Sequence, residues 1–329
     1  MANYKDIHGT KVEIRDDDPS NPVNGQVWYN SGTLKGHKLN PAGAWATGGN
    51  LNTARDFTSG AGTQTAALCF GGLKPPGSTL MGENESYNGT AWTELADLNT
   101  ARQDLGGAGT STAAIAIGGG TPDKVAANET WNGSGWTEVA DLNTTRRGTE
   151  QSTGIVTSAL CMGGDQDPPG QIDSVESWNG SSWTEIADLN TARARGTGTG
   201  VSNTAALCIA GATPSVSAVT ESWNGSSWTE VGDLNTARQR LAAASNTYTD
   251  SVVFGGYTST EVGVTETWNG SAWTEGTDMS TARTELGGGG ATSSSAIAFA
   301  GQTGSPNVRT AATEEWNSPG PTTVSFTVS

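Results

Sequence analysis

The 18 residues ESWNGSSWTEIADLNTAR, from Glu176 to Arg193, decide the architecture because close copies of them recur along the chain. Four further full copies begin at Glu85, Glu129, Glu221 and Glu266. The second Trp of the unit recurs every 44 to 47 residues, at Trp45, Trp92, Trp136, Trp183, Trp228 and Trp273. Self-similarity of this period is typical of β-propellers and solenoids, so the chain is predicted to repeat one supersecondary unit.

Each repeat predicts four short strands. A Gly-rich run such as LGGAGT precedes an alternating apolar run such as AAIAI, and two β-rich segments separated by Asn-Gly follow. Asn-Gly favours a type I′ hairpin, so Asn179 and Gly180 are expected to form a two-residue loop, with N-glycosylation of such triplets as the alternative. In that register Trp178 and Trp183 lie diagonally on a surface that the next blade covers. Four strands per repeat make one propeller blade.

The Gly-rich runs are predicted to be the innermost strands, where bulky side chains would clash around the central axis. They occupy residues 58–63, 105–110, 195–200 and 286–290. A phosphate-binding loop would need a Lys or a following helix, and neither accompanies these runs. No cofactor is therefore expected.

The first and last repeats are incomplete in complementary ways. The segment around Trp45 is a fourth strand without the first three, and the segment ending at Trp316 supplies three strands without a fourth. Joined, they make one blade, and such closure removes free sheet edges. The predicted fold is all-β: a six-bladed propeller with four strands per blade, closed by an N-terminal strand that completes the last blade, plus a short N-terminal hairpin extension.

The repeat resembles the kelch-type repeat of β-propellers over residues 41–317. The shared features are a double Gly ending the second strand, a Trp in the fourth, an Arg soon after, and an aromatic residue in the third strand: Tyr87, Trp131, Trp178, Trp223, Trp268 and Trp316. The spacing from that aromatic to the Trp is five residues, one shorter than usual for kelch repeats, and two units replace the double Gly by IAG and FAG. The resemblance implies a divergent, kelch-like protein-interaction scaffold.

Residues 1–40 lie outside the repeat, and GQVWYN and LKGHKL within them predict a small hairpin. The run DPSNPVNGQVWYNSGTLKG, residues 18–36, resembles a short module of structural proteins of tailed bacteriophages, especially marine ones. This resemblance implies a virion protein attached to neighbouring subunits through residues 1–40, with Trp28 and Tyr29 as candidate attachment residues. The alternative is a segment that merely packs under the propeller. Residues 318–329 are predicted to form a C-terminal strand that pairs with a neighbour's edge.

Charge and hydropathy exclude several partners. The formal net charge of −16 argues against nucleic-acid binding, which needs basic clusters. No 18-residue apolar run is present and the start MANYKDIHGT lacks an apolar leader, so neither membrane insertion nor a secretory route is expected. The expected location is the virion, with an extracellular or cell-surface site as the alternative.

The sequence offers little catalytic chemistry. Its two His residues, His8 and His37, lie outside the repeats, which excludes a His-based triad or a His-rich metal site within the ring. Glycoside hydrolysis would need a carboxylate pair, but the non-repeated carboxylates are scattered over different blades: Asp104, Glu150, Asp165, Asp167, Asp173, Asp250 and Glu261. We therefore expect no enzyme and no metal site. The cysteines Cys69, Cys161 and Cys208 share one register and are expected to be free and buried.

Two function classes remain after these exclusions. The first is a virion structural component, in the tail, a fibre or the capsid decoration, that binds other virion subunits within a multimeric assembly. The second is an adhesion module that binds host glycan or protein through the variable loops between second and third strands, where Tyr257 is the aromatic residue. The same face carries a ring of arginines that could contact an anion or, as the alternative, pair with the repeated glutamates: Arg55, Arg102, Arg146, Arg193, Arg238 and Arg283.

Overall fold

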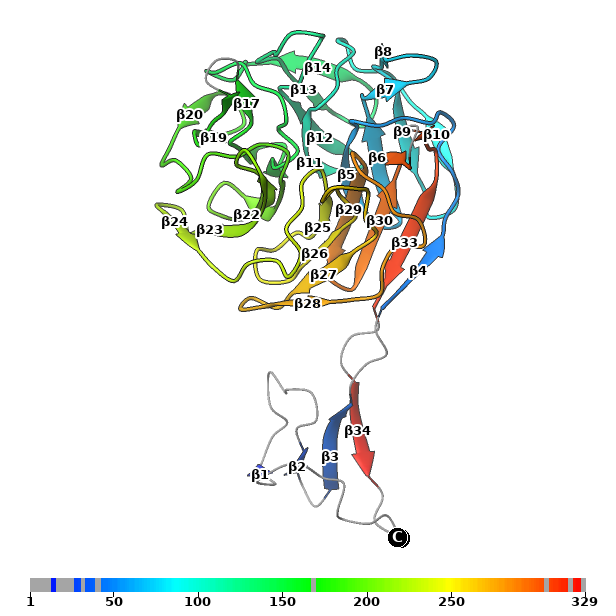
Figure 1. Cartoon of the computed structure of the whole chain (residues 1–329), viewed down its shortest axis with the longest axis vertical. Helices are drawn as coiled ribbons and strands as arrows, with labels where there is room; N and C mark the ends of the chain where they lie inside the picture. Colours follow the sequence, from blue (N-terminus) through cyan, green and yellow to red (C-terminus); the bar gives the residue numbers. More distant parts are fainter. Residues whose placement is uncertain are drawn as a thin grey trace. The chain divides into compact units, whose positions relative to one another are not determined.

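The computed structural model describes residues 13–15, 27–30, 33–38, 43–166, 170–304, 308–318 and 322–326. The chain divides into two compact units, one of Ala44–Asn317 and one that joins Met1–Gly43 to Ser318–Ser329. The first unit is a β-propeller (Figure 1). Within the described residues the structure contains strands and turns but no helix, and so none long and apolar enough to span a membrane.

Six antiparallel four-stranded sheets form the blades, and the strands of each blade follow one another from the propeller axis outward. From the innermost to the outermost strand, blade 1 contains β5 (Ser59–Thr63), β6 (Ala66–Phe70), β9 (Asn84–Tyr87) and β10 (Trp92–Glu94). Blade 2 contains β11 (Gly106–Thr110), β12 (Ala113–Ile117), β13 (Asn128–Trp131) and β14 (Trp136–Val139). Blade 3 contains β15 (Thr153–Ile155), β16 (Ser158–Met162), β19 (Val175–Trp178) and β20 (Trp183–Glu185).

The second half of the ring repeats this order. Blade 4 contains β21 (Thr197–Ser202), β22 (Ala205–Ala212), β23 (Val216–Trp223) and β24 (Trp228–Glu230). Blade 5 contains β25 (Ala242–Ala244), β26 (Ser251–Phe254), β27 (Thr265–Trp268) and β28 (Trp273–Glu275). Blade 6 contains β29 (Gly287–Thr292), β30 (Ser295–Phe299), β33 (Thr313–Asn317) and, from the start of the propeller, β4 (Ala44–Thr47).

Blade 6 closes the ring as the sequence predicted. Strand β4 pairs antiparallel with β33, and Trp45 lies opposite Trp316 in the ladder. The side chain of Gln64 in blade 1 reinforces the closure, because its Nε2 donates to the carbonyl oxygen of Trp316 at 2.8 Å. Closure leaves the six-bladed, four-stranded arrangement without an open gap between first and last blade.

The innermost strands form a continuous inner ring in which each contacts the next: β5, β11, β15, β21, β25 and β29. Small side chains are required there because neighbouring backbones approach closely. A Cβ added to Gly107 in β11 would lie 2.6 Å from the carbonyl oxygen of Gly60 in β5 and 2.8 Å from the ring of Phe70. The predicted reason for the Gly-rich runs is thus confirmed.

The Trp pair of each blade packs against the preceding blade, whereas the sequence predicted packing against the next one. Trp223 and Trp228 of blade 4 share one buried cluster with Leu160 and Met162 of blade 3. In the five blades with two Trp residues the rings lie 5.2 to 5.5 Å apart between centroids. Aromatic pairs at this separation contribute beyond their area burial, so the repeated Trp residues hold neighbouring blades together.

The turn between the paired Trp residues differs from the prediction. Trp178 lies directly opposite Trp183 rather than diagonal to it, so the loop has four residues, 179–182. The Oδ1 atom of Asn179 accepts from the backbone N–H groups of Ser181 at 2.9 Å and Ser182 at 3.0 Å. Asn179 therefore acts as the side-chain acceptor of an Asx turn, and Gly180 supplies the positive φ of 93°.

The connections between second and third strands form ordered ribbons on one face of the propeller. Three carry short hairpins: β7 (Leu73–Lys74) with β8 (Thr79–Leu80), β17 (Asp165–Gln166) with β18 (Gly170–Gln171), and β31 (Gln302–Thr303) with β32 (Val308–Arg309). Isolated bridges join these connections to the segment after the repeated arginines, as between Arg147 and Asp165. We call this side of the propeller the loop face.

The second unit contains one four-stranded sheet in the order β1 (Glu13–Arg15), β2 (Val27–Asn30), β3 (Thr33–Lys38) and β34 (Thr322–Phe326). Strands β2 and β3 form the expected hairpin. The C-terminal strand β34 pairs antiparallel with β3 of the same chain, whereas the sequence suggested pairing with a neighbour. The edge of the β2–β3 hairpin at β3 offers backbone N–H and C=O groups, and β34 pairs with them.

Substitution of Gly107 by Ala tests the close approach of the inner strands. Overpacking of this kind typically costs about 1–3 kcal/mol, so we expect Gly107→Ala to lower the free energy of unfolding by that amount in urea titrations. Gly135→Ala in the same blade is the control, because a Cβ there meets nothing within 4 Å. Equal effects of the two substitutions would contradict the packing explanation.

Candidate functional site

The six repeated arginines are fully buried, each with 0% exposure. Arg146 represents them: its Nη2 donates to Oε1 of Glu176 at 2.7 Å, and its Nη1 donates to the carbonyl oxygens of Gly163 and Ser174, both at 2.9 Å. The equivalent pairs are Arg55–Glu85, Arg102–Glu129, Arg193–Glu221, Arg238–Glu266 and Arg283–Glu314. Each arginine thereby fixes the connection that precedes a blade to the third strand of that blade.

A repeated asparagine completes this arrangement, which we call the interblade latch. Asn143 donates to Oε2 of Glu176 from its backbone nitrogen at 2.7 Å and from Nδ2 at 2.8 Å. Asn52, Asn99, Asn190 and Asn235 make the same two bonds in their blades. This residue was not among the predicted site residues, although its recurrence in LNTAR is visible in the sequence.

The proposed anion-binding role of the arginines is corrected by their burial. A guanidinium without exposed surface and already bonded to a carboxylate and two carbonyls presents nothing to an external anion. The alternative weighed from the sequence, pairing with the repeated glutamates, is what the structure shows. Burial also lowers the pKa of Arg102, Arg238 and Arg283, which the partner glutamates oppose.

The other predicted binding residues are spread over both units. Tyr257 is partly buried at the start of a variable loop, where its backbone forms bridges to Gln239 and Glu261. Trp28 and Tyr29 lie in β2, whose backbone pairs with β3. Among the scattered carboxylates, Asp167 lies outside the described residues.

The cysteines are buried and free, as the sequence predicted. Burial raises the pKa of Cys69 and Cys161 to about 11 and that of Cys208 to about 12. The reactive thiolate is therefore disfavoured at neutral pH.

A belt of backbone hydrogen bonds encircles the propeller axis at the loop face. Six equivalent residues, two positions after each repeated Arg, all have φ between 51° and 67°: Phe57, Asp104, Gly148, Arg195, Arg240 and Glu285. Each donates its N–H to the carbonyl oxygen of its counterpart in the preceding blade, at 2.6 to 3.4 Å. This axial belt links all six blades in one cycle. Five of its members are not Gly, so the left-handed backbone is held against an intrinsic cost of about 1–2 kcal/mol each.

Charged side chains concentrate at the belt. Glu285 forms an ion pair with Arg240, whose guanidinium lies 5.5 Å from the ring centre of Phe57. Nearby, Asp56 pairs with Arg309 at 2.7 Å. Such residues come from different repeats and vary from copy to copy, which is why no pattern in the sequence linked them.

The side chain of Glu150 lies near the propeller axis because the repeat is irregular before the first strand of blade 3. In five blades the first strand begins four positions after the repeated Arg, as from Arg102 to Gly106, whereas β15 of blade 3 begins seven positions after Arg146, at Thr153. The residues before β15 form a turn in which the N–H of Ser152 donates to the carbonyl oxygen of Thr149 at 2.9 Å. This turn places Glu150 inside the ring of inner strands.

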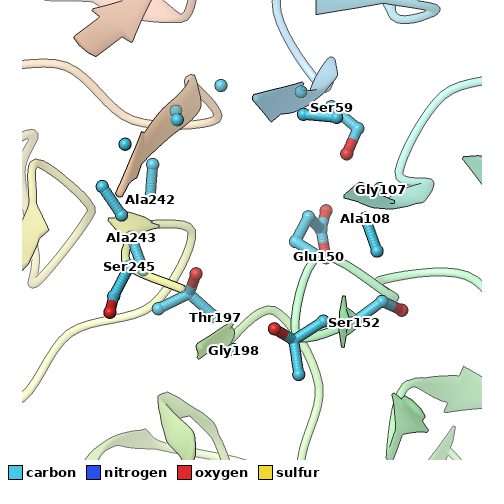
Figure 2. A pocket seen from close by; sticks show the side chains of 18 of the residues that line it. Ser59, Gly107, Ala108, Glu150, Ser152, Thr197, Gly198, Ala242, Ala243 and Ser245 are labelled. Atoms are coloured by element: carbon cyan, nitrogen blue, oxygen red, sulfur yellow. The ribbon is translucent and has the colours of Figure 1, made fainter. Parts of the chain in front are cut away.

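The inner strands enclose an axial well with a volume of about 100 Å³. Glu150 lies in its lining with residues from all six innermost strands, and Figure 2 shows its carboxylate reaching into the enclosed space. Most of the lining is Gly, Ala, Ser and Thr. The lining extends to Asn246, an exposed residue at the turn between first and second strands, away from the belt.

Burial, and to a smaller extent the negative charge of Asp104, raise the pKa of Glu150 to about 8 against the lowering effect of Arg195 and Arg240. Burial likewise raises the pKa of Glu285 to about 8. The expectation that Asp104 and Glu150 lie apart is thus wrong in one respect: propeller closure brings both to the axis. Within the described part of the chain, no group of three or more His, Cys, Asp and Glu side chains is arranged to hold a metal ion.

Comparison with known proteins places the fold but not the family. No protein-family model matches the chain, and no curated protein matches it significantly. Among solved structures, that of YjhT is similar, with a TM-score of 0.62 at 13% sequence identity, covering 80% of this chain and 95% of that one. Identity this low shows the fold alone, and the class defined by fold and axis is a six-bladed β-propeller.

Substitution of Glu176 by Gln tests the interblade latch. The change leaves the buried Arg146 without its carboxylate, and breaking a buried ion pair on one side typically costs about 3–5 kcal/mol. We expect that loss in the free energy of unfolding, measured by urea titration. Glu185→Gln is the matched control, because Glu185 is exposed on the neighbouring strand directly opposite Glu176. A loss below about 1 kcal/mol in Glu176→Gln would refute the latch.

The raised pKa of Glu150 predicts a pH-dependent stability. From about pH 4.5 to about pH 8 the folded chain holds a proton on Glu150 that the unfolded chain releases, so this group's stabilising contribution is present at low pH and falls as pH rises. Glu150→Gln lacks this dependence. The free energy of unfolding of Glu150→Gln, measured by chemical denaturation, should therefore rise relative to that of the unsubstituted protein between pH 5 and pH 8.5. Parallel curves over that range would contradict the raised pKa.

Proposed function

We propose that this chain is a non-enzymatic structural protein of a bacteriophage virion, in the tail, a fibre or the capsid decoration. The proposal rests first on the resemblance of residues 18–36 to a module of tailed-phage structural proteins. The observation that carries the attachment role is the second unit, in which both ends of the chain meet in one sheet. A module built from both termini leaves the propeller as one continuous insert between them.

The sheet of the second unit has the edges that attachment requires. Its outer strands, β1 and β34, each pair on one side only among the described residues. A strand edge offers a row of backbone donors and acceptors, and strand addition by a partner is a common mode of subunit recognition. Other virion subunits are therefore the proposed partners, and a multimeric assembly the proposed setting.

The propeller supplies the rigid part of this design. Six buried Arg–Glu pairs, six aromatic blade interfaces and the axial belt fix neighbouring blades to each other. Rigid supports suit interaction modules because binding then costs little conformational entropy. We assign the propeller the role of a protein-interaction disc, kelch-like in architecture.

The loop face supports a second candidate, an adhesion module for host surface glycan or protein on the virion or at a cell surface. Its hairpin ribbons are tied to each other across blades. Arg309 in β32 donates to the carbonyl oxygen of Gly77 and, at 3.3 Å, to the hydroxyl of Ser78 in the blade 1 loop. Next to it, Val308 is 56% exposed. Variable loops held in one shape on a rigid scaffold are a frequent location of binding sites.

Electron cryomicroscopy of the native assembly separates the two candidates, because a six-bladed ring is recognisable in a density map. We expect the terminal sheet to contact neighbouring subunits through β1 or β34. A loop face buried against tail or capsid subunits would exclude adhesion through it. A particle that lacks this chain altogether would refute the virion assignment.

Paired substitutions test the adhesion candidate on particles that carry the protein. If adhesion uses the loop face, Val308→Asp should reduce host-cell binding at least tenfold in a sedimentation assay, because it charges an exposed apolar position. Val201→Asp is the control, since Val201 is 49% exposed at the opposite end of an inner strand. Unchanged binding by both variants would leave the structural role as the proposal.

A further inference from the structure

The axial well contains one carboxylate whose bonding is incomplete. Atom Oε2 of Glu150 is buried and has no hydrogen-bond partner among the described residues. A buried carboxylate oxygen without a donor is costly, so native structures normally supply one. The side chain extends from the turn that precedes β15 in blade 3, where the other blades already have their first strand, and it lies among the inner strands (Figure 2).

We propose that the axial well binds a primary ammonium group on a short alkyl chain, with Glu150 as its counterion. This site goes beyond the proposed virion role and does not depend on it. Glu150 would accept a hydrogen bond from the ammonium at the unpartnered Oε2.

The volume of the well sets the size of the ligand. At about 100 Å³ it is somewhat smaller than the roughly 150 Å³ cavity that holds a benzene molecule. A chain of four carbons ending in an ammonium is of this order, whereas a whole monosaccharide is too large to be enclosed. The Gly and Ala residues of the lining leave space for the alkyl part.

Charge at the axis favours a cation. The carboxylates of Glu285 and Asp56 pair with Arg240 and Arg309, and Asp165 pairs with both Arg147 and Lys124. Oε2 of Glu150, the one carboxylate of the lining, has no partner among the described residues, so its charge, once the proton is lost, faces the well unpaired. The formal charge of −16 on the chain adds a general attraction for cations.

The remaining lining groups suit an ammonium better than a metal ion. Hard divalent ions seek several oxygen ligands, commonly more than one carboxylate, and Glu150 is the single carboxylate in the lining. An ammonium has three N–H donors, and after one reaches Glu150 the others can be accepted by hydroxyl or backbone oxygens. Ser152 and Ser245 bring such hydroxyls to the lining.

Calorimetric titration of the full-length protein with n-butylammonium chloride at constant ionic strength tests the site. We expect saturable binding at a one-to-one ratio, and at least a tenfold loss of affinity in Glu150→Gln. Butan-1-ol, the neutral analogue, should not bind measurably. Glu185→Gln should bind like the unsubstituted protein, because Glu185 lies on an outer strand exposed to solvent.

Affinity should also rise with pH. Glu150 has to lose its proton before it pairs with the cation, and its pKa is raised to about 8 by burial and by Asp104 against the effect of Arg195 and Arg240. The affinity should therefore rise by up to tenfold from pH 6 to pH 7 and level off above about pH 8. Alkylammonium groups stay protonated throughout, with pKa values near 10.4. Asp56, Asp104 and Glu285 lie in the same cluster and are unchanged in Glu150→Gln, which isolates the contribution of Glu150.

A second probe, Nα-acetyl-lysinamide, distinguishes the source of the ammonium. Binding of both probes assigns the well to a lysine side chain carried by a polypeptide, and binding of butylammonium alone assigns it to a free amine. The proposal is overturned if Glu150→Gln keeps its affinity, if butan-1-ol binds equally, if calcium chloride displaces butylammonium at lower concentration, or if no binding occurs at about 50 mM of the probe. None of these results bears on the place of the chain in a particle.

Discussion

A guanidinium and a carboxylate, both withdrawn from water, fix each interblade connection to the blade that follows it. Desolvating two charges is expensive, and their attraction compensates only when the remaining hydrogen-bonding groups are also satisfied. The latch of blade 3 meets that condition, because the glutamate accepts from Arg146 and Asn143 while the arginine also donates to two carbonyl oxygens. Because the connection leads straight into the innermost strand, the latch also positions the residues around the axis.

The axis is where the repeat stops being uniform. The axial belt needs only backbone groups in one conformation, so its six side chains are free to differ, and they include acids, arginines and Phe57. The turn before β15 in blade 3 departs further and places a carboxylate inside a well otherwise lined with small residues. Symmetric elements hold the ring together, and asymmetric ones give its centre a particular charge and shape.

The two units of the chain have different proposed roles. Pairing of β4 with β33 closes the propeller, so the ring has no gap between its first and last blades. The small sheet keeps open edges at β1 and β34 among the described residues, where backbone pairing with another subunit is possible. The likeness to YjhT, at 13% identity, shows the fold alone, and a fold does not by itself specify a function. The proposed roles therefore rest on the terminal module, the loop face and the axis.

The sequence by itself determined the all-β class, six blades, four strands per blade and the closure through the segment around Trp45. Those features follow from local periodicity and from counting repeats, which require no knowledge of distant contacts. It also indicated that repeated arginines would pair with repeated glutamates, although the burial that decides between pairing and anion binding was not visible. The four-residue turn at Asn179 was misjudged because cross-strand Trp pairing overrides the local preference of Asn-Gly for a two-residue loop.

Only the tertiary structure decided which non-repeated charges meet. Asp104, Glu150 and Glu285 are 46 and 135 residues apart in sequence, and they approach each other because every blade delivers its first strand to one common axis. The capture of β34 by β3 is likewise a non-local event, since it joins the two ends of the chain. The repeat sequence determines the structure of each blade, whereas closure of the ring determines which non-repeated residues lie next to each other.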